Sequence, residues 1–271
     1  MAPTNLEFYD VAMRPPDGKH NCAVNPWKTR LALNFKSIPY KTTWVQLPDI
    51  SRIRQTLNIP ACRKFADGTD FYTLPILVDP NTSRKLGDSF DIAVYLQKQY
   101  PEANDLFPPQ SLDYVYNPET EILIPLSQCD DGEYPQYARF NMNVDAAFTS
   151  HVMLMAHGMP FDPATAEACK AEFVRRAGVS CWDDFAVGGE VREKIVASFE
   201  SMLGGLAKLF ENTDGPFILG HRASYADLIV GAWLMMSSRT LPAEEWESVR
   251  GWHGGVFGRL FDALQVYAVA K

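Results

Sequence analysis

The stretch that decides the fold reads YTLPILVD at residues 72–79. A proline inside an apolar run argues against a central strand, because proline has no N–H to donate to the ladder. The conflict disappears if Pro75 stands at the start of the strand, and the Leu74–Pro75 bond then becomes a candidate cis bond. Asp88 and Ser89 open the next helical pattern, and the free N–H groups of a helix start suit a small carboxylate. We therefore expect these two segments to form a pocket for a small acidic peptide.

The surrounding residues predict a small α/β domain over residues 1–100. Apolar residues recur every four positions from Trp27 to Phe35, which predicts an amphipathic helix at 26–37 with Asn25 as its N-cap. The other expected elements are strands at 6–10, 40–47, 74–78 and 84–87, helices at 48–57 and 89–100, and loops at 11–25 and 58–70. Strands and helices in this order predict a mixed sheet with helices packed on it.

The second half of the chain predicts an all-helical domain. Four prolines among polar residues make residues 101–118 a linker, and no convincing strand pattern follows in residues 119–271. Ser224 and Asp227 have the spacing of a capping box ahead of an apolar run, so we interpret this pair as structural and not catalytic. Helices are expected at 119–128, 138–157, 163–177 and 191–210, after the capping box, and from Val256 to Tyr267.

Composition excludes several classes of function. The chain has 271 residues and a net charge of −8, which argues against a nucleic-acid or anionic-membrane surface. No apolar run approaches the roughly 20 residues that a membrane helix needs. Five cysteines without a CxxC pair, and no signal-peptide pattern at the amino terminus, predict free thiols in the cytoplasm. His151 and His157 are six residues apart on different helix faces, so no metal site is expected.

Three motifs in this order resemble those of cytosolic glutathione transferases. Leu74-Pro75 resembles the cis-proline motif of that family. Residues 88–92 resemble its Glu/Asp-Ser-x-x-Ile motif, and residues 220–227 resemble the capping box of its core helix. The resemblance covers nearly the whole chain. It implies a thioredoxin-like amino-terminal domain with a mixed four-stranded sheet, an all-helical carboxyl-terminal domain with a hydrophobic substrate site, glutathione as cosubstrate, and a homodimer.

Two segments indicate a subfamily. Residues 25–36 and 44–50 resemble the fungal-specific class A transferases and the bacterial β-etherase-like group. Those proteins carry a Ser-Pro-Asn run before the first helix, with Ser or Asn near the glutathione sulfur. The comparable stretch here is Ala23-Val24-Asn25, so the serine is absent and Asn25 is the matching polar residue.

The resemblance also implies roles for individual residues. Leu74, followed by Pro75, is expected to pair its backbone with the cysteinyl part of glutathione. Asp88 is expected to meet the γ-glutamyl ammonium, and Ser89 the α-carboxylate. Asn25 is expected to donate its amide N–H to the thiolate, although its oxygen could instead only cap the helix. The glycine carboxylate requires a cation, for which Arg54 and Lys64 are the candidates.

These roles predict a transferase that conjugates glutathione to hydrophobic aromatic electrophiles, or uses glutathione to cleave them. Cys22 provides an alternative as a nucleophile that forms a mixed disulfide with glutathione, in a thiol transferase or lyase. Tyr9, at the end of the first strand, is a further possible thiol donor. A non-catalytic, ligandin-type protein that binds small aromatic ligands on the same fold is the third alternative.

Overall fold

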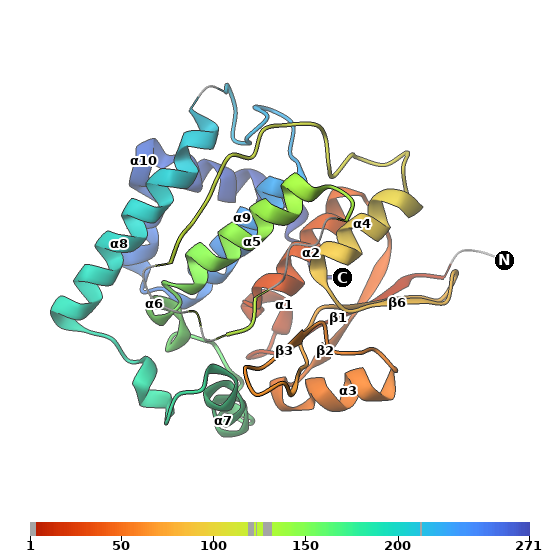
Figure 1. Ribbon diagram of the computed structural model, residues 1–271, viewed down its shortest axis with the longest axis horizontal. Coiled ribbons are helices and arrows are strands. Elements are labelled where there is room, and N and C mark those ends of the chain that lie inside the picture. The colour runs from red at the N-terminus through yellow and green to blue at the C-terminus, as the bar shows by residue number, and fades with distance from the viewer. Residues whose placement is uncertain (1–3, 119–121, 123, 127–131, 212) are drawn as a thin grey trace.

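The computed structural model describes residues 4–118, 122, 124–126, 132–211 and 213–271 (Figure 1). The amino-terminal part contains a four-stranded sheet of β1 (Leu6–Val11), β2 (Tyr40–Val45), β5 (Ile76–Asp79) and β6 (Arg84–Leu86). Their order is β2-β1-β5-β6, with β1 parallel to β2 and the other pairs antiparallel. The expected mixed four-stranded sheet is confirmed.

Helices and a small hairpin complete this part. The helices are α1 (Asp17–His20), α2 (Val24–Phe35), α3 (Ile50–Thr56) and α4 (Ser89–Gln99), with a 3-10 turn, η1, at Leu47–Asp49. Residues 58–70 were expected to be loop, but they contain β3 (Arg63–Lys64) and begin β4 (Asp70–Phe71), which pair antiparallel. Two-residue strands are too short to leave an alternating sequence pattern, so periodicity could not reveal them.

The described residues from 132 onward form helices joined by turns and loops and contain no strand. The helices are α5 (Pro135–Thr149), α6 (Met153–Ala156), α7 (Ala166–Ala177), α8 (Gly189–Ala207), α9 (Tyr225–Thr240) and α10 (Ala243–Leu264), with 3-10 turns η2 (Trp182–Phe185), η3 (Lys208–Phe210) and η4 (Gln265–Tyr267). The helix expected at 119–128 lies mostly outside the described residues, and those described there, 122 and 124–126, are not helical. None of the described helices has the length and apolar character needed to cross a membrane.

The start of α10 was not predicted. Pro242 followed by Glu244 and Glu245 is a helix-start signal that the sequence contains, because acidic side chains favour the first turn. Residues 252–255 leave the helical conformation, and Gly254 and Gly255 there adopt positive φ angles. The part after this interruption, from Val256 onward, is the part in which the apolar pattern predicts a helix.

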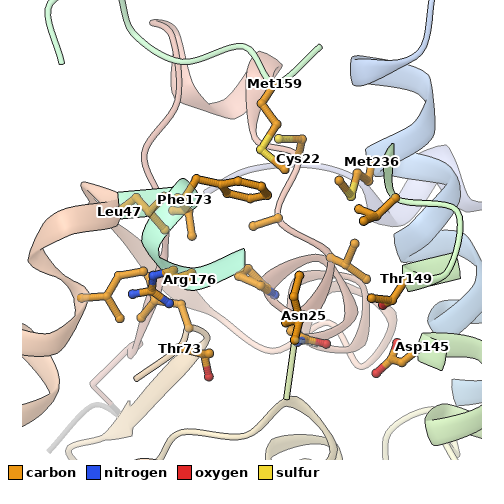
Figure 2. A pocket seen from close by; sticks show the side chains of 18 of the residues that line it. Cys22, Asn25, Leu47, Thr73, Asp145, Thr149, Met159, Phe173, Arg176 and Met236 are labelled. Atoms are coloured by element: carbon orange, nitrogen blue, oxygen red, sulfur yellow. The ribbon is translucent and has the colours of Figure 1, made fainter. Parts of the chain in front are cut away.

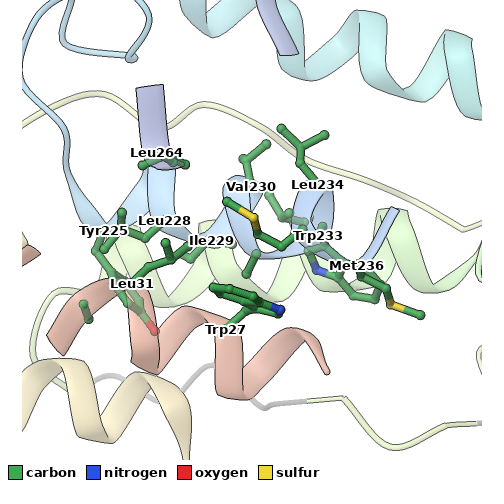
Figure 3. Close-up of a cluster of buried hydrophobic side chains, with 14 of the residues drawn as sticks. Trp27, Leu31, Tyr225, Leu228, Ile229, Val230, Trp233, Leu234, Met236 and Leu264 are labelled. Atoms are coloured by element: carbon green, nitrogen blue, oxygen red, sulfur yellow. The ribbon is translucent and has the colours of Figure 1, made fainter. Parts of the chain in front are cut away.

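Helix α9 is the centre of the core and joins the two parts of the chain (Figure 3). All its residues from Tyr225 to Ser237 are buried, as expected for a helix that is apolar on every side. Ser224 and Asp227 form the predicted capping box at its start. Figure 3 shows Trp27 and Leu31 of α2 lying against α9, so helix α2 of the sheet domain packs on the core helix of the second domain.

Candidate functional site

A cavity of about 230 Å³ lies where the two parts of the chain meet (Figure 2). Its lining comes from the start of α2, the η1 turn, the segment before β5, and helices α5, α7 and α9. Most of the wall is apolar. The apolar residues of the second part that supply it are Ile124, Pro125, Leu126, Val152, Met159, Phe161, Phe173, Trp233 and Met236. Apolar walls with a few polar groups are typical of a small-molecule site.

The first turn of α2 faces this cavity, and Asn25 lies in that turn. The prediction that Asn25 caps the helix is wrong, because α2 begins at Val24 and its N-cap is Ala23. Pro26 is the third residue of the helix instead of the first, and it is tolerated there, since a first-turn N–H has no partner within the helix. Among the described residues no hydrogen bond engages the Asn25 side chain, and its Oδ1 atom is buried. The Asn25 amide is therefore not used for capping.

Cys22 lines the cavity but does not have the properties of a nucleophile. Its side chain is buried, and burial raises the pKa of the Cys22 thiol to about 12. A reactive cysteine needs its pKa lowered, because the thiolate is the attacking species. Tyr9 lies outside the cavity lining; its hydroxyl donates to Glu7, and partial burial raises its pKa.

The Leu74–Pro75 peptide bond is cis, as predicted, and Leu74 lines the cavity. The side chain of Arg54 supports this segment from beneath. Its Nη1 atom donates to the carbonyl oxygens of Thr73 at 2.6 Å and Gly87 at 3.0 Å, and its Nη2 donates to that of Pro60. A single buried guanidinium therefore holds together the two loops that precede β5 and α4.

Asp88 and Ser89 lie at the start of α4, next to the cavity but not in its lining. Asp88 is the N-cap residue, and its Oδ1 accepts from the backbone N–H groups of Phe90 and Asp91. Ser89 is buried, and its Oγ has no hydrogen-bond partner within the described part of the chain. The hydroxyl of Tyr225, at the start of α9, donates to the carbonyl oxygen of Ser89 at 3.0 Å. The core helix therefore positions the start of α4.

Neither of the two cations expected for the glycine carboxylate lines the cavity. Arg54 is fully buried and bonded to backbone carbonyls, while Lys64 is exposed and lies 3.7 Å from Asp70. The described cations that do line the cavity are Arg63 and Arg176. Sequence reasoning missed both, because an arginine that turns inward looks no different in sequence from one on the surface.

A buried ion pair lies beneath the start of α2. Lys28 Nζ lies 2.5 Å from Asp145 Oδ1 and donates to Asn141 Oδ1 at 2.8 Å, and both partners belong to α5. Trp233 Nε1 of α9 donates to the same Asp145 oxygen at 2.8 Å. Burial lowers the pKa of Lys28, and Asp145, which lines the cavity, opposes this shift. Lys28 is three residues after Asn25, so this pair joins the turn that carries Asn25 to the helical domain.

The described residues contain no group of three or more His, Cys, Asp or Glu side chains that could hold a metal ion. The fold and the cavity instead define a class: a thioredoxin-like domain joined to a helical domain, with an organic-ligand site at their junction. The family model for the glutathione S-transferase N-terminal domain matches residues 24–99, and that for the C-terminal domain matches residues 138–267. The chain therefore belongs to the glutathione S-transferase family.

Individual relatives agree with this assignment. The glutathione S-transferase-like protein ustS of Aspergillus flavus is 27% identical over 95% of this chain and 89% of its own length. A glutathione S-transferase of Ceriporiopsis subvermispora, crystallised in complex with glutathione, is 27% identical with a TM-score of 0.81 and covers 99% of both chains. Glutathione transferase GSTFuA2 of Phanerochaete chrysosporium is 25% identical with a TM-score of 0.76, over 99% of this chain and all of its own.

Proposed function

We propose that this protein binds glutathione along the cavity and stabilises its thiolate with Asn25, for transfer to a hydrophobic electrophile. One observation carries the proposal. The Asn25 amide lies in the first turn of α2, at the cavity wall, and no described residue engages it. An amide N–H₂ in that place can donate to a sulfur anion.

The energy required is within reach of this arrangement. A thiol with a pKa of about 8.5–9 is mostly protonated at neutral pH, and lowering that pKa by two units corresponds to about 2.7 kcal/mol. A hydrogen bond to a charged group contributes about 1.5–3 kcal/mol. The amino-terminal end of α2 adds the positive end of its dipole, which favours an anion. Positioning and charge stabilisation therefore suffice without a general base.

The rest of glutathione is proposed to lie along the segments identified from the sequence. The backbone N–H and C=O of Leu74, set by the cis bond to Pro75, pair with the cysteinyl part. Neither group makes a hydrogen bond within the described residues, which supports this role. Ser89 Oγ and the start of α4 take the γ-glutamyl carboxylate. Asp88, whose Oδ2 lies 3.6 Å from Arg63, takes the ammonium.

The second substrate is proposed to be a hydrophobic, aromatic electrophile. Phe161, Phe173 and Trp233 supply flat apolar surface to the cavity, and Met159 and Met236 supply adaptable side chains. The similarity to GSTFuA2 supports membership of the fungal-specific class A group. We further propose that residues 1–100 form the glutathione-binding domain, residues 101–118 the linker and residues 119–271 the domain with the electrophile site. The protein is proposed to be a cytoplasmic homodimer.

Two alternatives are less well supported. The raised pKa of Cys22 argues against a thiol transferase or lyase that depends on this residue. A non-catalytic, ligandin-type protein would have the same cavity but would need no thiolate. Turnover of a chlorinated nitrobenzene with glutathione distinguishes this carrier from a transferase, because a carrier would bind apolar aromatics without turnover.

The proposal is tested by Asn25→Ala. A hydrogen bond from Asn25 favours the charged thiolate and so lowers its pKa. Removal of this hydrogen bond should raise the pKa of the thiol of bound glutathione by about 1–2 units. Activity should fall at neutral pH and recover as the pH rises. The thiolate absorbance of the complex as a function of pH gives the pKa directly, and the pH profile of kcat/KM gives the kinetic consequence.

Asn117→Ala is the control, because Asn117 is an exposed asparagine outside this cavity. It should leave the thiol pKa unchanged. If Asn25→Ala binds glutathione with the same thiol pKa as the unmodified protein, Asn25 does not contact the sulfur and this mechanism is wrong.

A further inference from the structure

Two guanidinium groups of the described residues face the cavity, and they belong to different parts of the chain. Arg63 lies 3.6 Å from Asp88, at the end proposed for the γ-glutamyl group. Arg176 comes from α7, in the helical domain. Figure 2 shows Arg176 and Thr73 at one side of the cavity and Asp145 at the other, with Asn25 between them.

Arg176 is held firmly in place. Its Nε atom donates to Glu172 Oε1 at 2.8 Å, and its Nη1 atom donates to the carbonyl oxygen of Tyr72 at 2.7 Å. The guanidinium lies over the ring of Phe71, 5.4 Å from its centre, and 10% of the side chain is exposed. A guanidinium has five N–H donors. Nη2 makes no hydrogen bond to any described residue, so this group is available for a ligand.

The α7 helix itself is fixed to the sheet domain. It packs against η1, and Thr165, just before the helix, donates from Oγ1 to Gln46 Oε1 at 3.0 Å. Arg176 therefore does not have to be ordered when a ligand arrives. A preorganised cation loses little conformational freedom on binding.

The direction of the cosubstrate places its carboxyl end beside Arg176. In an antiparallel pairing with Leu74, the ligand residue after the cysteinyl unit lies opposite the protein residues before Leu74. Those residues are Thr73, which lines the cavity, and Tyr72, whose carbonyl oxygen Arg176 holds. The glycine of glutathione follows its cysteine and ends in a carboxylate. An arginine fork is well suited to bind a carboxylate.

We propose that Arg176 binds the glycine carboxylate of glutathione, so that the helical domain contributes directly to the cosubstrate site. This inference rests on the proposed function, because it concerns the same bound glutathione. It also assigns the cation that neither Arg54 nor Lys64 supplies. Bound glutathione would then connect the start of α4 with α7, and so bridge the two domains.

The test uses glutathione and its glycine monoethyl ester, which lacks the carboxylate. Isothermal titration should show that the unmodified protein binds glutathione about 10- to 100-fold more tightly than the ester, the range expected for hydrogen bonds to a charged group. Arg176→Gln should bind both ligands with the weaker affinity, so that the preference disappears. Arg176→Lys keeps the charge without the fork and should restore part of the preference.

The variants should remain folded, since Glu172 keeps its ion pair with Arg175 when Arg176 is replaced. Arg175→Gln is the matched control: Arg175 is the next residue, its side chain is 59% exposed, and it does not line the cavity. It should keep the full preference for glutathione over the ester.

Two results would refute the role of Arg176, and a third would refute the proposed function. Equal binding of glutathione and ester by the unmodified protein would refute the role of Arg176 and leave the proposed function intact. A preference that persists in Arg176→Gln would refute it as well. Binding of neither ligand by the unmodified protein would refute the proposed function itself.

Discussion

Replacing Lys28 with Met is expected to destabilise the protein strongly although no active-site group is removed. Lys28 is fully buried and belongs to α2, whereas its partners Asp145 and Asn141 belong to α5. Met has a similar length and no charge. The substitution therefore leaves the Asp145 carboxylate buried without its counter-ion, with the indole N–H of Trp233 as the remaining donor to it among the described residues.

The size of the effect follows from this geometry. Breaking a buried pair by removing one partner costs about 3–5 kcal/mol, because the other charge stays desolvated. The hydrogen bond from Trp233 offsets part of that cost, so we expect about 3 kcal/mol for Lys28→Met. Asp145→Asn should cost a similar amount, since the buried Lys28 ammonium then loses its counter-ion. The double variant removes both charges and keeps an acceptor for Trp233, so its cost should be smaller than the sum by at least about 2 kcal/mol.

Guanidinium denaturation of the four proteins measures these free energies. Circular dichroism and tryptophan fluorescence should be followed together, because coincident transitions are needed before a two-state free energy is meaningful. Additive costs, equal within about 0.5 kcal/mol to the sum of the single variants, would refute an energetic coupling between Lys28 and Asp145. If Lys28→Met lowers the free energy of unfolding by less than about 1 kcal/mol, the ion pair of Lys28 with Asp145 does not stabilise the contact between α2 and α5.

Two further predictions concern the loops around the cavity. Gly87→Ala should cost about 1–3 kcal/mol and weaken glutathione binding, because a Cβ there would overlap the buried Arg54 guanidinium that also holds Thr73. Denaturation measures the stability and titration calorimetry the glutathione affinity. If both are unchanged in the variant, Arg54 moves aside freely and this reasoning is wrong. Cys22→Ala should keep its turnover with glutathione, since burial raises the pKa of Cys22 to about 12. A folded Cys22→Ala protein without turnover would instead make Cys22 the nucleophile.

Much of the fold could be predicted because the signals for it depend on only a few neighbouring residues. Pro75 cannot sit inside a central strand, and this local restriction led to both the strand position and the cis bond. The capping box at Ser224 and Asp227 needs only two side chains three residues apart, and it was found where expected. Local chemistry failed at Asn25, where Asn followed by Pro has the form of a helix start. The helix begins earlier, with the weak cap Ala23, and the residues of this first turn line the cavity.

The sequence by itself determined the four strands of the main sheet, the proline-led strand among them, the helical character of the second half and the family resemblance. Only the tertiary structure decided what the basic side chains do. Lys28, Arg54 and Arg176 are indistinguishable in sequence from surface charges, yet one pairs across the domain junction, one holds two loops, and one faces the cavity. The physical reason is that secondary structure depends on neighbours along the chain. The role of a charge depends instead on burial and on partners far away in sequence, which exist only after the two domains have packed together.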